Sequence, residues 1–282
     1  MRTKQIAFAV AILAVMGYLY FQPLKALPKT DSGHDAPKNA GVSTAPPANV
    51  TVEHVSATAK AAIGGGLSVK INDLEAKLQK ASADAEKTDL EKQLAKTWDD
   101  VNQPAPAAFY YLAVARKENA FGQWMNAGTR FNDAYKASSD TAAAPTFVSN
   151  AVEAFQNATK LNPTSLDAKT GLGVAYVNGG ATPMQGIALL REVVEKDPNN
   201  VAANLNLGLF SMKSGQYDKA VQRFKTLIAI KPDFEAYFYL AESYKQIGKK
   251  TEAIAAYQKC KELMPDPTFT QRIDQYIKEL QN

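Results

Sequence analysis

Residues 203–232, ANLNLGLFSMKSGQYDKAVQRFKTLIAIKP, alternate small and large residues in a helical pattern. Small residues stand at Gly208, Gly215 and Ala220, and bulky residues such as Phe224 lie close to them in the pattern. Small residues let two helices approach closely, while large neighbours fill the space on either side. A proline cannot continue a helix interior, so Pro232 marks a turn. The stretch therefore predicts two tightly packed helices followed by a connection.

The same alternation recurs along the chain. In the next copy, residues 234–266, Gly248 follows Gly215 by 33 residues. Upstream copies contain insertions but keep the pattern, and together the copies run from residue 88 to residue 266. Recurrence at a near-constant interval is typical of stacked repeats, in which each unit is too small to bury its apolar face alone.

These repeats resemble the tetratricopeptide repeat (TPR) family, whose pattern is a Trp-x2-Leu-Gly-x2-Tyr motif, then Ala-x3-Phe and a late proline. The resemblance implies that each unit is a pair of antiparallel helices, A and B, joined by a short turn. We therefore expect an all-α protein, an α-solenoid of about five TPR helix-turn-helix units with N- and C-terminal capping helices. The most literal copy of the pattern consists of Trp124, Ala127, Gly128, Phe131, Ala151, Phe155 and Pro163.

We assign the solenoid to residues 88–266 and predict one more helix after it. In residues 267–282, Phe269, Ile273 and Leu280 share one helical face, and charged residues occupy the other. One apolar and one polar face is what a helix needs if it covers the last repeat and faces solvent. We therefore predict a C-terminal capping helix.

The segment before the solenoid, residues 66–87, has apolar residues at heptad spacing from Leu67 to Ala85. This spacing fits a capping helix folded onto the first repeat, and it also fits a coiled coil that makes a homo-oligomer. Thr88 and Glu91 have the spacing of a capping box, which predicts that the first repeat helix begins there. The sequence leaves the two interpretations of residues 66–87 open.

The N-terminus carries an uncharged apolar run from Ile6 to Phe21, preceded by Arg2 and Lys4. A run of this length is at the short edge of a membrane span and also fits a signal peptide. Its aromatic end favours retention, because tyrosine and phenylalanine suit a membrane interface. We therefore expect residues 1–27 to be an N-terminal membrane anchor, or alternatively a cleaved signal sequence.

Residues 28–65 are rich in proline, alanine and small polar residues, which predicts a flexible linker with a short helix near its end. With a basic N-terminus ahead of the apolar run, the expected location is the bacterial inner membrane. The chain would be single-pass, with a cytoplasmic N-terminus and a periplasmic TPR body.

Composition disfavours several chemical functions. The net charge is +4, from 32 basic and 28 acidic residues that alternate along the chain, so we expect no nucleic-acid partner. Cys260 is the single cysteine, and the two histidines, His34 and His54, lie in the predicted linker. A metal site or a histidine-based catalytic triad is therefore not expected. We predict no cofactor, no metal, no catalytic residues and no enzymatic activity.

The family resemblance implies that the A helices expose a concave surface on which a peptide or a partner helix lies. Inward positions of the fourth and fifth repeats predict an apolar, adaptable floor for such a segment. The alternative is that these side chains pack against a neighbouring repeat or the C-terminal helix. The candidate partner-binding residues are Leu205, Leu209, Met212, Phe238, Glu242, Met125, Thr129 and Lys92.

The expected function is therefore a membrane-tethered, extracytoplasmic TPR scaffold that binds a peptide or partner protein on its concave face. This layout is similar to that of single-anchor repeat proteins that accompany secretion or envelope assembly machinery. The alternative is a structural oligomer, in which a coiled coil over residues 66–87 presents several TPR domains.

Overall fold

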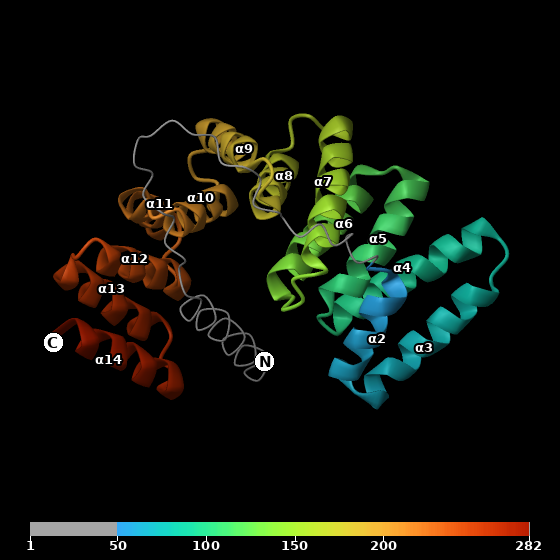
Figure 1. Cartoon of the computed structure of the whole chain (residues 1–282), viewed down its shortest axis with the longest axis horizontal. Helices are drawn as coiled ribbons and strands as arrows, with labels where there is room; N and C mark the ends of the chain where they lie inside the picture. Colours follow the sequence, from blue (N-terminus) through green and yellow to red (C-terminus); the bar gives the residue numbers. More distant parts are fainter. Residues whose placement is uncertain (1–49, 282) are drawn as a thin grey trace, which may run out of the picture. The chain divides into compact units, whose positions relative to one another are not determined.

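The computed structural model describes residues 50–281 as a succession of helices (Figure 1). Within this range every regular element is α-helical. The helices are α2 (Val52–Ile63), α3 (Gly65–Lys80), α4 (Asp84–Asp100), α5 (Pro104–Glu118), α6 (Phe121–Ala137), α7 (Ala144–Leu161), α8 (Leu166–Gly179), α9 (Pro183–Lys196), α10 (Val201–Lys213), α11 (Tyr217–Ile230), α12 (Phe234–Gln246), α13 (Lys250–Leu263) and α14 (Pro267–Gln281).

Each helix packs against the next one in the chain. Consecutive helices pair as α4 with α5, α6 with α7, α8 with α9, α10 with α11, and α12 with α13, and the contact of α5 with α6 between two such pairs is at least as extensive. We call the first member of each pair an A helix and the second a B helix. The A helices α6, α8, α10 and α12 also contact one another in sequence. This arrangement is an α-solenoid, as the sequence predicts.

Polar residues just after the repeat prolines begin the later A helices. The side chains of Ser165, Asn200 and Asp233 each accept a hydrogen bond from the backbone N–H three residues on, at 3.1, 2.9 and 2.8 Å. An N-terminal cap of this kind satisfies a backbone donor that has no partner within the helix. The proline that stops one unit is thus followed by the residue that starts the next.

The turn inside the later hairpins requires glycine. Gly180, Gly215 and Gly248 have φ angles of 68°, 72° and 75°. In this left-handed region a Cβ atom costs energy, so glycine is favoured where the chain leaves the A helix and enters the B helix.

Close helix contacts explain the small residues of the repeat. A Cβ atom on Gly208 would lie 2.7 Å from the Phe224 ring, and one on Gly171 would lie 2.3 Å from the Phe155 ring. Gly186 approaches backbone, because its Cβ would lie 2.3 Å from the carbonyl oxygen of Gly173. The A and B helices therefore meet where glycine leaves room, and the aromatic rings fill that room.

The core continues from one pair to the next. One buried cluster centres on Ile71, Leu94 and Trp98 and joins α2, α3, α4 and α5. A second contains Phe131 and Phe155 and extends from α5 to α8. At the other end, α14 buries Phe269, Ile273 and Leu280, as its amphipathic pattern predicts.

The region before the first repeat differs from the prediction. The heptad pattern from Leu67 to Ala85 does not form one helix, because extended residues at Ala81 and Ala83 separate α3 from α4. α4 begins at Asp84, so the capping box predicted at Thr88 is wrong, and Thr88 instead donates to the Asp84 carbonyl at 2.8 Å. The break allows α3 to fold onto α4, which brings the apolar residues of both helices into one core.

The last part of the predicted linker is helical. α2 covers Val52–Ile63 and packs against α3 and α5, with Val55 and Ala59 buried. Its N-cap is Thr51, whose hydroxyl accepts from the His54 N–H at 3.4 Å. The flexible character predicted for residues 28–65 therefore does not extend to this helix.

The predicted localisation is wrong. It requires a single span through the bacterial inner membrane, whereas the part of the chain from residue 50 to residue 281 has no helix that is both long and apolar enough to cross a bilayer. The predicted anchor, residues 1–27, lies outside the described residues.

Candidate functional site

A stripe of apolar residues follows α10. Leu205, Leu209 and Met212 are spaced by four and three residues, which places them on one face of the helix. All three are half-buried, and Val201, one turn earlier on the same face, is 46% exposed. We call these four residues the α10 stripe. An apolar face that is open to solvent over part of its area is suited to contact with another polypeptide.

A small recess lies at the start of this stripe, between α10 and α12. Its apolar wall includes Val201, Leu205 and Leu227. Asp233 and Glu235 bring carboxylates to the recess, and Lys231 and Ala236 complete the lining. We call this the Glu235 recess.

The two carboxylates of the recess have different roles. Asp233 caps α12, since its Oδ1 accepts from the Ala236 N–H at 2.8 Å. Glu235 is half-buried, and this burial raises the pKa of its carboxyl, with the nearby Asp233 charge adding to the effect. The Tyr239 hydroxyl and the Lys136 ammonium oppose that rise in pKa. A cation placed in the recess would therefore stabilise the charged form of Glu235.

Two predicted binding residues on α12 are used for internal packing. Phe238 is only 6% exposed, and its ring centroid lies 6.0 Å from that of Tyr257 and 6.2 Å from that of Tyr276. Glu242 accepts a hydrogen bond from the Tyr257 hydroxyl. Burial, followed by the Glu242 charge, raises the pKa of Tyr257 far above its usual value. Phe238 therefore does not belong to an exposed floor, because α13 and α14 cover it.

The remaining predicted residues lie on other A helices. Met125 is half-buried against the core cluster of α5 to α8. Thr129 is exposed on α6, while the Lys92 ammonium lies 2.5 Å from the Glu118 carboxylate. The structure thus brings together Leu205, Leu209 and Met212 on one helix, with the other candidates elsewhere along the solenoid.

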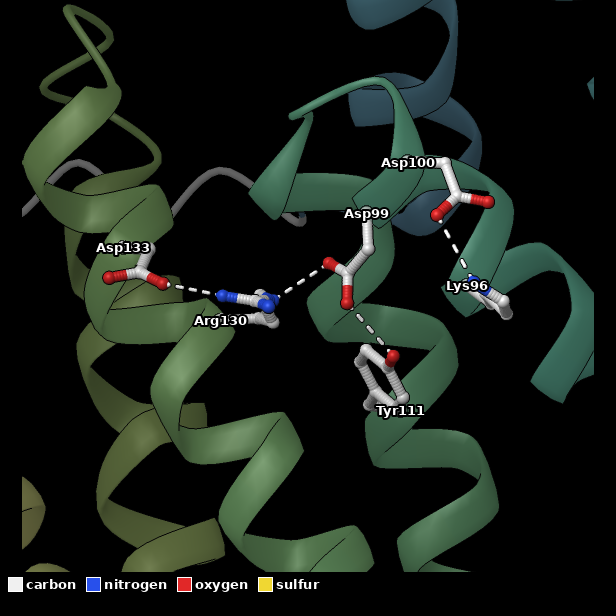
Figure 2. A network of polar contacts seen from close by, with 6 residues as sticks. All are labelled: Lys96, Asp99, Asp100, Tyr111, Arg130 and Asp133. Atoms are coloured by element: carbon white, nitrogen blue, oxygen red, sulfur yellow. Dashed lines mark hydrogen bonds and ion pairs between the residues drawn. The ribbon is translucent and has the colours of Figure 1, made fainter. Parts of the chain in front are cut away.

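A polar network joins α4, α5 and α6 (Figure 2). Arg130 lies between two carboxylates, with Nε 2.7 Å from Asp99 Oδ1 and Nη1 3.0 Å from Asp133 Oδ2. The Tyr111 hydroxyl donates to Asp99 Oδ2 at 2.9 Å. Asp100, next in sequence, pairs instead with Lys96 at 3.1 Å. Asp99 therefore serves as an acceptor that links α4 to both α5 and α6.

The network predicts an unusual titration of Tyr111. Burial, and then the hydrogen bond to Asp99, raise the pKa of Tyr111 to about 12. Because the fold favours the protonated phenol, its stabilising contribution is present below pH 10 and is lost as the pH rises through about 12. We expect Asp99→Asn to lower the Tyr111 pKa, measured by NMR of ring-labelled tyrosine. Asp100→Asn is the matched control and should have a much smaller effect; equal shifts in both variants would contradict this role for the hydrogen bond.

The single cysteine, Cys260, lies in the core on α13. Cys260 is fully buried, and its thiol contacts the Phe234 carbonyl oxygen at 3.4 Å. Burial raises the pKa of this thiol to about 12, which opposes formation of a nucleophilic thiolate. Within residues 50–281, no group of three or more His, Cys, Asp or Glu side chains is placed to hold a metal ion.

Solved structures with a similar fold are TPR proteins. A tetratricopeptide repeat protein from Parabacteroides merdae is 19% identical and has a TM-score of 0.55, with 81% of this chain and 88% of that chain covered. A thermophilic TPR protein of Thermus thermophilus is also 19% identical, with a TM-score of 0.52 and coverages of 67% and 97%. At this identity the likeness concerns the fold alone.

Family models agree with these structures over the second half of the chain. Three models described as tetratricopeptide repeat match residues 146–200, 185–242 and 234–267. The sequence matches no curated protein. Residues 146–267 are therefore tetratricopeptide repeats, and the helices before them continue the same α-solenoid.

Proposed function

We propose that the chain is a scaffold that binds a short amphipathic segment of another protein along α10. The observation that carries this proposal is the α10 stripe, which leaves four apolar side chains partly open to solvent beside the Glu235 recess. Stacked helix pairs hold such a surface rigidly, so little ordering is needed when a partner binds. TPR hairpins are suited to this role because each contributes one A helix to a continuous surface.

The recess indicates which kind of segment fits. A lysine or arginine side chain has an apolar stem and a charged end. The stem would lie on Val201 and Leu205, and the charge would approach Glu235. This pairing offsets the cost of keeping the Glu235 carboxylate half-buried. The proposed partner segment therefore has a basic residue followed by apolar residues at helical or extended spacing.

Selection from a random peptide library on the immobilised chain tests the proposal. Wild type should enrich peptides that combine one basic residue with two or more apolar residues. Leu205→Asp should weaken their binding by about tenfold or more, because it places a carboxylate in the apolar contact. Glu235→Lys should instead change the selection, replacing the basic residue of the enriched peptides with a neutral or acidic one.

Leu161→Asp is the matched control, since Leu161 is 45% exposed at the end of the B helix α7. It should leave peptide binding unchanged. Circular dichroism must show that all variants remain helical. If folded Leu205→Asp binds the enriched peptides as tightly as wild type does, the α10 stripe is not the binding surface.

A further inference from the structure

A groove of about 390 Å³ runs along one side of the helix pair α8 and α9. This volume is within the range of sites that hold a small ligand or the side chains of a peptide. The residues that line it do not belong to the α10 stripe or to the Glu235 recess. The lining residues are Leu172 and Tyr176 on α8, and Gln185, Ala188, Leu189 and Glu192 on α9.

One end of the groove carries an excess of positive charge. The ammonium groups of Lys169 and Lys196 both donate to the same oxygen of Glu192, Oε1, at 2.6 and 2.9 Å. These bonds, from Lys169 first and then from Lys196, lower the pKa of the Glu192 carboxyl, so it is charged at neutral pH. Among residues 50–281 neither lysine pairs with a second carboxylate. Two ammonium groups against one carboxylate therefore leave one unit of positive charge at this end.

The opposite end of the groove is polar and uncharged. The Tyr176 hydroxyl accepts a hydrogen bond from Gln156 Nε2 of α7 at 2.9 Å, which holds the tyrosine ring beside α7. The O–H of Tyr176 can still donate to a peptide carbonyl, and the exposed amide of Gln185 can donate or accept. These groups suit the main chain of a bound segment and do not select for its charge.

Between the two ends the floor is apolar. Leu172 is 7% exposed, Leu189 is half-buried, and the small exposed Ala188 leaves space beside them. From Lys169 to Tyr176 the α8 face is about 10 Å long, at about 1.5 Å per residue. An extended peptide rises about 3.3 Å per residue and points alternate side chains to the same side. The groove therefore has room for about three extended residues, with two side chains directed into it.

We propose that the groove between α8 and α9 binds an extended acidic segment of a partner protein, in which an Asp or Glu is followed two residues later by an apolar side chain. The carboxylate joins Lys169 and Lys196 beside Glu192 and neutralises the excess charge. The apolar side chain lies on Leu172 and Leu189. This surface has the opposite charge preference to the Glu235 recess, so the chain offers two partner sites of different chemistry.

NMR titration with a synthetic peptide, Gly-Ser-Glu-Ser-Leu-Ser-Gly with both ends blocked, tests the site on the full chain. The methyl signals of Leu172 and Leu189 should move and saturate. A second peptide with Lys in place of Glu should move them much less at the same concentration. The methyl signals of Leu205 and Leu209 report separately on the α10 stripe, so the failure of one site is distinguished from the failure of the other.

Three variants change the groove without removing its apolar floor. Lys196→Glu should weaken the glutamate peptide by about fivefold or more and should bind the lysine peptide instead. Glu192→Gln should tighten the glutamate peptide by about two- to fivefold, because it removes the carboxylate that competes for the lysines. Ala188→Gln should weaken both peptides at this site, because its longer side chain occupies the space beside the leucines.

Lys259→Glu is the matched control for the charge reversal. Lys259 is 53% exposed and pairs with Glu262 on its own helix, much as Lys196, which is 54% exposed, pairs with Glu192. It should bind the glutamate peptide as wild type does. The proposal is overturned if the glutamate and lysine peptides move the Leu172 and Leu189 signals equally in wild type, or if folded Lys196→Glu and Ala188→Gln both keep wild-type affinity for the glutamate peptide.

Discussion

Replacing Gly186 with alanine should destabilise the protein by about 2–3 kcal/mol, the upper part of the range for overpacking a rigid contact. The new Cβ atom would lie 2.3 Å from the Gly173 carbonyl oxygen and 2.7 Å from a Val177 methyl group. A methyl group can rotate away, but the carbonyl oxygen is part of the α8 backbone. Relief therefore requires α8 and α9 to separate, which also loosens the buried contacts of Leu190.

Urea unfolding followed by circular dichroism measures this effect. Gly122→Ala is the matched control, because Gly122 is also helical and a Cβ atom there meets nothing within 4 Å. That control should be neutral or stabilising by up to about 1 kcal/mol, since alanine favours helix more than glycine does. Equal unfolding midpoints for Gly186→Ala and wild type would show that the two helices do not approach as closely as described.

The repeat architecture could be predicted because each unit carries its signals locally. Prolines such as Pro232 end one unit, caps such as Asp233 begin the next, and glycines such as Gly215 make the hairpin turn. These signals depend on the backbone conformation of a few adjacent residues. Their recurrence along the chain made the α-solenoid predictable even though no single copy is decisive.

The N-terminal hairpin could not be predicted in the same way. Residues Ala81–Ala83 contain neither proline nor glycine, and alanine is compatible with both helix and extended backbone. The break lets α3 fold back onto α4, which buries Ile71 and Leu74 against Leu94 and Trp98. This burial stabilises the break. A heptad pattern describes an apolar face but does not say whether that face meets another chain or the same one.

The candidate sites show the same division between local and long-range information. Leu205, Leu209 and Met212 follow from spacing within one helix, so the sequence predicts that they share a face. The packing of Phe238 under α13 and α14 depends on how the last repeat meets the terminal helix.

Contacts between separate helices are also missing from the prediction. Nothing in the sequence places Val201 beside Glu235, because this pair joins two helices of different hairpins. Such pairs are set by the stacking of the repeats, so a pattern within one repeat does not contain them.

Phe155→Ala should be the most destabilising single change that we predict, at about 3–5 kcal/mol. The ring is 2% exposed and lies where added Cβ atoms on Gly128 and Gly171 would meet it. It therefore fills a space bounded by three helices, and truncation leaves a cavity that those helices cannot easily close. Urea unfolding measures the loss in free energy of unfolding.

A double-mutant cycle then tests whether Phe155 and Gly171 are complementary in shape. Gly171→Ala alone places a Cβ atom 2.3 Å from the ring, so it should destabilise the wild-type background. In a Phe155→Leu background the smaller side chain leaves room for that methyl group, and the cost of Gly171→Ala should fall by about 1 kcal/mol or more. Phe147→Leu is the matched control, since Phe147 is equally buried in the same cluster but is not among the atoms nearest to Gly171. Additive effects in both backgrounds would mean that glycine is kept at position 171 for a reason other than the ring. If only the Phe155→Leu background lowers the cost of Gly171→Ala, the contact between Phe155 and Gly171 explains why the repeat pairs a large residue with a small one.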